Sequence, residues 1–475
     1  MGDAEEATAV AADANPYENP HLLRRPASVA EIDGTELFTF QEAIGNDINR
    51  RGPFMFLVED DVLAYTSMNC VVFENLTHGT RKYLPGIDEN GVSAMAVHPS
   101  RSYIAVGGKG FNPRIFIYSY PDLEIVKICS GGAERGYASL HFNVNGESGD
   151  KLASVATGPD FMLTIWDWQN EAVELHSKAF GQDVVAVKFS QDDDRRLTTS
   201  GSGHIRFWKM AATFTGLKLQ GYIGKFGKVD LSDISTFMEL PDAKVISGSE
   251  SGSILLWEGN FIKCRFVRPD VDNPQDLSPR SRMAALRSPR SNKIMCHAGE
   301  IHYIDLDREE RCIITAGEDG YIRWWDYDII DKAEVDSDIT MDFEIAPRAE
   351  WFLGVGRGIR SVMDSGVIGG TRFFVILDKQ SNLTMVRFPV SQSAQLVNQI
   401  ESKVEPEMKF ISAFQGGPIL GMGASFTSHK IATCGVDGSI TLFEYDKKKI
   451  IAKRCFDSKA NCLEWIPQGY EKLAK

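Results

Sequence analysis

The sequence predicts an all-β protein, a β-propeller of seven or eight blades. One pattern recurs along the chain: a short apolar run, a turn rich in Gly, Ser or Asp, and a second apolar run that ends in an aromatic residue. The pattern occurs eight times, and its closing aromatic residues are Phe73, Tyr118, Trp166, Trp208, Trp257, Trp325, Phe388 and Phe443. The first four intervals are 42–49 residues long, close to the period of about 40–45 residues found where each repeat forms one four-stranded blade.

Each copy of the pattern also reads as a hairpin. In IITAGEDGYIRWWDY (313–327), one strand runs up to Ala316, Asp319-Gly320 supplies a tight turn, and Ile322 to Trp325 form the returning strand. Further apolar runs between the copies supply the other strands of each sheet. Such a sheet cannot bury both faces alone, so the sheets are expected to stack around a ring. A βαβ array would need amphipathic helices of 10–15 residues between the strands, and the sequence shows none.

The extent of the repeat pattern also predicts where the propeller begins and ends. Residues 1–30 are acidic, alanine-rich and aperiodic, which predicts a disordered tail. We expect the propeller to span 31–467, with a C-terminal extension at 468–475. Within it, 392–409 has a helix-like pattern interrupted by Pro406, and CLEWIPQG (462–469) reads as a strand that starts a second propeller or closes this one.

Composition narrows the class of protein. The formal net charge of -14 and a pI near 5.2 argue against a duplex nucleic-acid binder and favour protein partners. The eight cysteines form no CxxC pair, which predicts free thiols in a reducing compartment. The first residues lack the features of a signal peptide, and no run of about 18 apolar residues occurs, so we expect neither secretion nor a membrane span.

Several residues recur at fixed places in the copies, which predicts a structural role for them. A buried tryptophan N–H needs a hydrogen-bond acceptor, and a hydroxyl on the neighbouring strand and a turn carboxylate can tie the strands together. The residues assigned to this role are Trp166, Trp208, Ser247, Trp257, Thr315, Asp319, Trp325, Thr433, Asp437 and Phe443.

No candidate for cofactor, metal or catalytic chemistry meets the requirements of its motif. VGGKG (106–110) and GVGRG (354–358) lack the strand-to-helix context of a phosphate-binding loop and read as turns. Cys296, His297 and His302 are the densest Cys/His group, but zinc needs four ligands and strand alternation would separate these three. We therefore expect no cofactor, no metal, no catalytic residue and no enzyme activity.

A basic segment at 268–293 interrupts the repeats and is expected to be a mobile loop. Ser278 and Ser288 each precede a Pro-Arg pair, and Arg280, Arg282, Arg287 and Arg290 add positive charge. One interpretation is contact with an acidic partner surface, such as a tubulin tail, that phosphorylation of Ser278 or Ser288 would weaken. The other interpretation is a solvated insertion without a partner.

Two stretches carry a family resemblance. LTTSGSGHIRFWKMAATFTGLKLQGYIGKFGK (197–228) and MELPDAKVISGSESGSILLWEGNFIK (238–263) resemble the cilia- and flagella-associated protein 44 family, WD-repeat components of motile axonemes. PDFMLTIWDWQNEAVELHSKAF (159–180) and the copy at 313–327 also resemble it. The likeness extends from about residue 37 to about residue 467. The run from Phe214 to Gly227 is distinctive because generic WD repeats lack it.

The resemblance implies a WD40-type propeller that serves as a non-catalytic scaffold of the ciliary or flagellar axoneme. It implies a place in the tether and tether head that link the motor domain of inner-arm dynein to the doublet microtubule and so regulate beating. The implied partners are cilia- and flagella-associated protein 43, inner-arm dynein heavy chains and doublet microtubules, with no nucleic acid and no membrane. Family members are longer, with a second propeller and a coiled-coil region, which leaves open what this chain does alone. The alternative is a general WD-repeat adaptor in a cytoplasmic multiprotein complex, because the fold is compatible with either role.

Overall fold

The computed structural model describes residue 43 and residues 45–48, 50–67, 69–86, 91–143, 149–214, 216–269, 293–335, 341–368, 371–389, 406–425 and 427–465. Ile44–Lys475 form one compact unit, and the fold below lies within it. The expected disordered tail (1–30) and the C-terminal extension (468–475) lie outside the described residues. Among the described residues, none of the helices has the length and apolar character needed to cross a bilayer.

The first half of the chain forms four antiparallel sheets of four consecutive strands each. The first sheet contains β1 (Met55–Leu57), β2 (Val62–Ser67), β3 (Cys70–Asn75) and β4 (Arg81–Pro85). The second contains β5 (Val92–Val97), β6 (Tyr103–Gly108), β7 (Ile115–Ser119) and β8 (Ile125–Cys129). The third contains β9 (Tyr137–Phe142), β10 (Lys151–Ala156), β11 (Met162–Asp167) and β12 (Ala172–Lys178). The fourth contains β13 (Val184–Phe189), β14 (Arg196–Gly201), β15 (His204–Thr213) and β16 (Gly216–Ile223).

The second half forms four more sheets. The fifth contains β17 (Ile234–Glu239), β18 (Val245–Ser249), β19 (Ile254–Glu258), β20 (Phe261–Pro269) and β21 (Lys293–Met295), with β25 (Asp342–Glu344) parallel to β20. The sixth contains β22 (Ile301–Asp307), β23 (Cys312–Gly317), β24 (Tyr321–Asp326) and β26 (Ala349–Phe352), and the short helix α2 (Tyr327–Asp331) follows β24. The seventh contains β27 (Ile359–Ile368), β28 (Thr371–Asp378), β29 (Asn382–Pro389) and β30 (Glu407–Ala413). The eighth contains β31 (Ile419–Ala424), β32 (Lys430–Gly435), β33 (Ser439–Glu444) and β34 (Lys449–Cys455).

The eight repeat copies correspond to the second and third strands of the eight sheets, so the predicted fold class is confirmed. In the sixth sheet, Cys312 pairs with Asp326 and Ala316 with Ile322 across the predicted hairpin. Gly320 lies in its turn at a φ of 78°, a backbone conformation that favours glycine because it lacks a Cβ.

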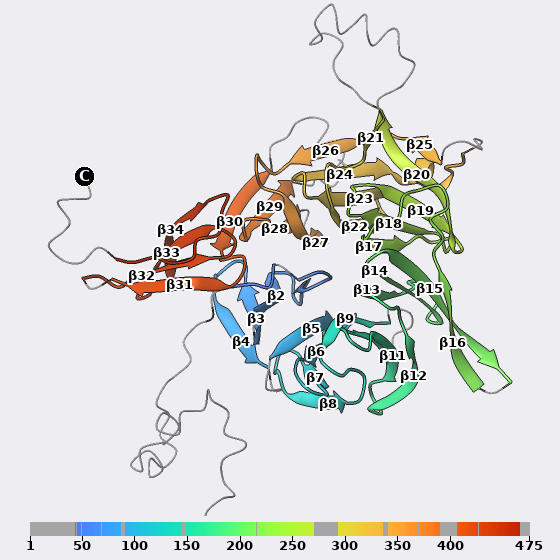
Figure 1. Cartoon of the computed structure of the whole chain (residues 1–475), viewed down its shortest axis with the longest axis horizontal. Coiled ribbons are helices and arrows are strands. Elements are labelled where there is room, and N and C mark those ends of the chain that lie inside the picture. Colours follow the sequence, from blue (N-terminus) through green and yellow to red (C-terminus); the bar gives the residue numbers. More distant parts are fainter. Residues whose placement is uncertain are drawn as a thin grey trace, which may run out of the picture. The chain divides into compact units, whose positions relative to one another are not determined.

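Seven of the sheets close into a ring (Figure 1). A cluster of buried apolar side chains lies between each sheet and the next, from the first through the seventh. A seventh cluster joins the seventh sheet back to the first, with Val375 and Leu377 of β28 against Leu63 and Tyr65 of β2. Full burial of one such side chain contributes about 1.5–3 kcal/mol, so every interface is held by several favourable contacts.

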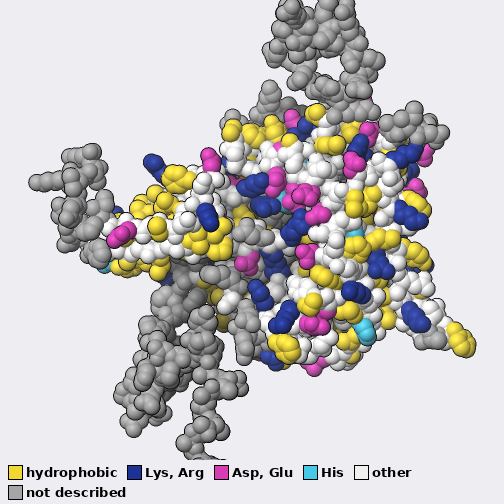
Figure 2. Space-filling view, viewed as in Figure 1, with side chains coloured by type: hydrophobic (Ala, Val, Ile, Leu, Met, Phe, Trp, Pro, Cys, Tyr) yellow, Lys and Arg dark blue, Asp and Glu magenta, His cyan; other side chains and the backbone are white. Residues whose placement is uncertain are grey.

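The eighth sheet lies beside this ring and not within it (Figure 1). It contributes no side chain to the seven apolar clusters of the described residues. Ile419 and Met422 of β31 are 49% and 70% exposed, and Figure 2 shows apolar side chains on its surface. The sequence was compatible with either seven or eight blades. The structure has a ring of seven blades and an additional four-stranded sheet beside it.

Residues 392–405 of the helix-like stretch lie outside the described residues, and 407–409, which follow Pro406, belong to strand β30. One local expectation was wrong. Cys462 to Trp465 form no strand. Instead they lie against β31, where the Trp465 indole N–H donates to the Gly423 carbonyl oxygen at 2.7 Å.

Candidate functional site

Four sheets of the ring carry a buried tryptophan on the third strand that bonds to a hydroxyl on the second strand. The indole Nε1 lies 2.8 Å from the acceptor oxygen in Trp166–Ser154, 2.9 Å in Trp208–Thr199, 2.8 Å in Trp257–Ser247 and 2.8 Å in Trp325–Thr315. A buried N–H left without an acceptor would cost about 1–3 kcal/mol. Each bond thus fixes the pairing of two strands within one sheet.

Sequence reasoning named two of these four hydroxyls and missed Ser154 and Thr199. The sequence does contain a pattern that identifies these acceptors, because each acceptor hydroxyl belongs to the third residue of its apolar run: LAS, LTT, VIS and IIT. Thr433 holds the same position in IAT of the eighth copy, but that copy closes with Phe443, whose side chain has no N–H to donate.

In the sixth sheet the bond extends into a buried network. Thr315 Oγ1 lies 2.8 Å from His297 Nε2, and His297 Nδ1 lies 2.9 Å from Asp319 Oδ1. Arg323 Nη1 donates to Asp319 Oδ2 at 2.7 Å. With its proton on Nδ1, His297 donates to Asp319 and accepts from Thr315, whose oxygen accepts the Trp325 N–H. Burial tends to raise the pKa of Asp319, but the His297 hydrogen bond and the Arg323 charge outweigh it and hold that pKa well below its usual value.

The structure separates the Cys/His group that the sequence places close together. Cys296 is buried, its Sγ lies 3.4 Å from the Phe266 carbonyl oxygen, and burial raises its thiol pKa to about 12. His297 belongs to the network around Thr315, whereas His302 lies at the central channel. His297 is therefore a hydrogen-bonding member of the sixth sheet, a position that sequence reasoning considered only as a metal ligand.

The eighth sheet keeps only part of this arrangement. Asp437 accepts from the backbone N–H of Gly416 at 2.8 Å and of Ser439 at 3.0 Å, so it holds its turn as Asp319 does. Thr433 and Phe443 are partly exposed. Its hairpin is thus fixed locally, and in the described part of the eighth sheet no histidine or arginine bonds to Asp437 as His297 and Arg323 bond to Asp319.

A cavity of about 620 Å³ occupies the central channel of the ring. Residues of the innermost strands β1, β5, β9, β13, β17, β22 and β27 line it, together with the segment that precedes β1. These lining residues come from sequence positions some 300 residues apart. No single motif could have indicated this cavity.

The segment before β1 crosses one mouth of the channel. Arg51 Nη1 lies 2.9 Å from Asp233 Oδ2, directly before β17 on the opposite side. Gly52 has a φ of 92°, and a Cβ there would lie 2.5 Å from the Val185 carbonyl oxygen. The close approach therefore requires glycine, and the segment spans from the first sheet to the fourth and fifth.

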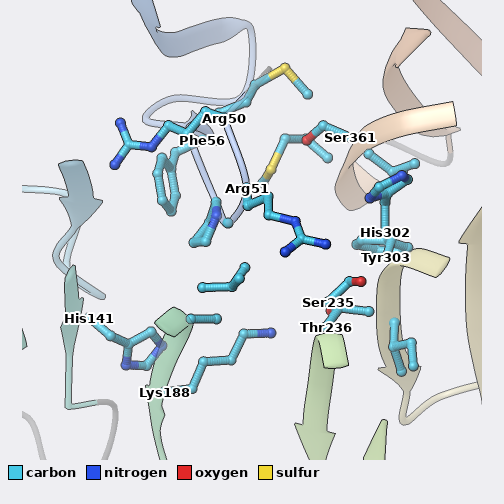
Figure 3. Close-up of a pocket in the computed structure, with 18 of the residues that line it drawn as sticks. Arg50, Arg51, Phe56, His141, Lys188, Ser235, Thr236, His302, Tyr303 and Ser361 are labelled. Atoms are coloured by element: carbon cyan, nitrogen blue, oxygen red, sulfur yellow. The ribbon is translucent and has the colours of Figure 1, made fainter. Parts of the chain in front are cut away.

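Lys188 of β13 and His141 of β9 line the channel (Figure 3). The Lys188 ammonium donates to the Phe237 carbonyl oxygen at 3.0 Å and lies 5.5 Å from the centre of the Phe237 ring. Burial lowers the pKa of Lys188. Burial, with the Lys188 charge, lowers the pKa of His141 to about 3, and its Nδ1 accepts from the Phe189 N–H at 3.2 Å.

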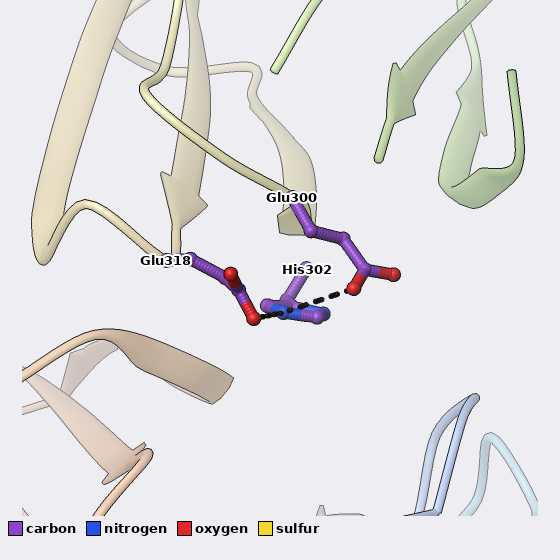
Figure 4. Close-up of side chains that lie close together, drawn as sticks. All are labelled: Glu300, His302 and Glu318. Carbon is purple, nitrogen blue, oxygen red and sulfur yellow. Dashed lines mark ion pairs between the residues drawn. The ribbon is translucent and has the colours of Figure 1, made fainter. Parts of the chain in front are cut away.

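Glu300, His302 and Glu318 lie together at the rim of the channel (Figure 4). Arg360 Nη1 lies 3.1 Å from His302 Nε2 and 3.4 Å from Glu318 Oε1, and Lys379 Nζ lies 2.8 Å from Glu318 Oε2. The hydrogen bond with His302 and these cations lower the pKa of Glu318 to about 2. The two carboxylates are thus already neutralised by protein cations, an arrangement that competes with a metal ion.

Adding Zn²⁺ is therefore expected to leave the melting temperature of the protein unchanged. The Arg360 guanidinium would have to move away from His302 Nε2 before that nitrogen could bind a metal ion. Thermal unfolding with and without a tenfold excess of Zn²⁺ measures this, with Arg360→Met as the comparison variant. A rise of several degrees in the unchanged protein would contradict the interpretation of the cluster as an ion-pair network.

The basic loop candidates Ser278, Arg280, Arg282, Arg287, Ser288 and Arg290 lie outside the described residues. The ends of that loop are described, because β20 and β21 pair from Val267↔Met295 to Pro269↔Lys293. Arg268 Nη1 lies 3.6 Å from the Glu350 carboxylate. The loop thus leaves the fifth sheet from a paired two-stranded base.

Comparisons with known proteins agree with this geometry. A family model described as WD domain, G-beta repeat, matches residues 289–326, the segment that holds the His297 network and the sixth hairpin. The chain is a WD-repeat β-propeller. Cilia- and flagella-associated protein 44 of Mus musculus is 36% identical over 454 residues, 95% of this chain and 22% of that protein. The protein of the same name in Chlamydomonas reinhardtii is 38% identical over 89% of this chain and 22% of its own length.

The predicted resemblance to cilia- and flagella-associated protein 44 is thereby confirmed. This WD-repeat propeller spans about a fifth of the length of those relatives. Human echinoderm microtubule-associated protein-like 4 is 25% identical over 291 residues, which are 59% of this chain and 28% of that protein.

Proposed function

We propose that this WD-repeat propeller is a non-catalytic scaffold of the motile-cilium axoneme, in the tether and tether head that link inner-arm dynein motor domains to the doublet microtubule. The observation that carries the proposal is the 36% identity with mouse cilia- and flagella-associated protein 44 across 95% of the chain. In this role the chain restrains the motor mechanically and performs no chemistry.

The packing of the ring supports a scaffold role. Seven apolar interfaces close it, and the polar side chains that recur in its sheets hydrogen-bond to one another. A closely packed interior transmits strain instead of absorbing it. Such a disc is suited to holding partners at fixed distances.

The proposed partners are the doublet microtubule, inner-arm dynein heavy chains and cilia- and flagella-associated protein 43. The microtubule is supported by a second relative whose name describes it as microtubule-associated. The charge of -14 is consistent with protein partners and unfavourable for a nucleic acid.

Proximity labelling of the tagged full-length protein in a ciliated cell tests the proposal. We expect inner-arm dynein heavy chain, cilia- and flagella-associated protein 43 and axonemal tubulin to be enriched over cells that express the labelling enzyme alone. Neighbours that lack every axonemal protein would favour instead a general WD-repeat adaptor in a cytoplasmic complex.

A further inference from the structure

A two-stranded arm projects from the fourth sheet. Strand β14 pairs with β15 only as far as Arg196↔Lys209, whereas β15 and β16 continue to pair as far as Thr213↔Gly216. The arm therefore extends roughly 15 Å past the last residue that pairs with β14, at about 3.3 Å per residue. Figure 1 shows it projecting away from the ring.

The base of the arm is firmly packed. The Arg206 guanidinium carbon lies 4.2 Å from the centre of the Trp208 ring, and Trp208 bonds to Thr199. Gly221 of β16 lies opposite Trp208, and a Cβ there would lie 2.5 Å from Arg206 Nε. Glycine thus allows the two side chains to stack against β16, which holds the direction of the arm while its tip reaches into solvent.

The arm is basic in an acidic protein. Residues 209–218 contain two lysines and no aspartate or glutamate, in a chain whose net charge is -14. Lys209 and Lys218 lie on one face of the arm. Lys209 and Ala211 are two residues apart on β15 and so point to the same face, and Ala211 pairs with Lys218 on β16. Both are exposed, and neither has an ion-pair partner in the described part of the chain.

The same arm ends in apolar side chains. Phe214 at its tip is fully exposed, and Leu217 beside the tip is 40% exposed. Figure 2 shows apolar side chains at the end of the projection with basic side chains near them. Aromatic residues, including phenylalanine, are enriched in the cores of protein interfaces, which have a polar rim, whereas a solvated hairpin tip is normally polar.

We propose that the β15–β16 arm docks on an acidic protein surface, with Phe214 as the apolar anchor and Lys209 and Lys218 as the charged contacts. Charge complementarity selects this partner, because Lys209 and Lys218 are exposed on an arm without an acidic residue, and two such charges attract an acidic surface and repel a basic one. The inference rests on the proposed function in one respect: the acidic microtubule surface is taken as that partner.

Co-pelleting of the purified chain with microtubules polymerised from tubulin tests the arm. We expect binding at about 50 mM salt that weakens at about 300 mM, because added salt screens exposed charges. Lys209→Glu with Lys218→Glu should weaken binding roughly tenfold or more, and Phe214→Ser should weaken it to a similar extent without changing its salt dependence.

Matched variants elsewhere on the chain serve as controls. Lys82→Glu with Lys449→Glu makes the same charge change on other exposed strands, and Phe111→Ser removes another exposed phenylalanine. These controls should bind as the unchanged chain does, and all variants should melt within about two degrees of it. The inference is overturned if the unchanged chain does not pellet or if the arm variants pellet like the controls. A negative co-pelleting result would leave the proximity-labelling result unchanged. The docking role of the arm and the axonemal role of the chain are therefore tested separately.

Discussion

Replacing Asp319 by alanine is expected to lower the free energy of unfolding by about 3–5 kcal/mol, the usual cost of removing one partner of a buried ion pair. Arg323 and Asp319 have side-chain exposures of only 3% and 8%. Without the carboxylate, the guanidinium keeps its ion pair with Glu350 at 3.1 Å and its contact with the Tyr321 ring. It then faces the His297 Nδ1–H at 2.9 Å with no carboxylate to accept from both donors. Equilibrium unfolding by urea, followed by tryptophan fluorescence, measures the loss.

Asp437→Ala in the eighth sheet is the matched control. Asp437 holds an equivalent turn through hydrogen bonds to Gly416 and Ser439 but contacts no buried arginine or histidine in the described residues. Replacing Asp437 by alanine should lower the free energy of unfolding by about 1 kcal/mol. Equal costs for the two aspartates would mean that only the turn matters and that the sixth-sheet network adds no stability.

Acidification from pH 7 to pH 5 is expected to lower the free energy of unfolding of the propeller. In the His141→Gln variant this decrease should be smaller by about 2 kcal/mol. Burial, reinforced by Lys188, lowers the pKa of His141 in the folded chain to about 3, against about 6.5 in an unfolded chain. As the pH falls below about 6.5, the unfolded chain takes up the proton first, so the free energy of unfolding decreases by about 1.4 kcal/mol per pH unit.

Glutamine is the informative replacement because its amide oxygen can accept the Phe189 N–H that His141 Nδ1 accepts now. Urea unfolding of both proteins at pH 7 and pH 5 gives the comparison. Part of the acid sensitivity should remain in the variant, since burial also lowers the pKa of His297 and His204. Identical decreases in the two proteins would show that His141 is not the residue responsible.

The sheets could be predicted from the sequence because a hairpin is local. Asp319-Gly320 and the apolar runs beside it lie within fifteen residues. The number of sheets in the ring could not be predicted, because the eighth copy has the same pattern as the sixth. Its lower burial depends on the first and seventh sheets having closed on each other, as Leu63 and Val375 do, and that contact spans more than 300 residues.

The same limit applies to the candidate site. The roles of Thr315 and Trp325 follow from their position in a repeat, whereas His297 lies before the first strand of its sheet and reads in sequence as one of a pair with Cys296. Lys188 and His141 come from different sheets, and only the curvature of the ring brings them to one channel. A repeat pattern encodes each sheet, but the channel is a property of the closed assembly.

The seam between the first and seventh sheets has a mechanical consequence. Strand hydrogen bonds do not cross it, because no described sheet combines strands from the two ends of the chain. Side-chain packing and the hydrogen bond that the Lys409 ammonium of β30 donates to the Leu76 carbonyl oxygen at 2.9 Å are described contacts that resist separation there. Tension applied between residues 45–54 and β30 would load this seam before any other interface, so under force the disc should open first at that junction, while its remaining six interfaces stay intact.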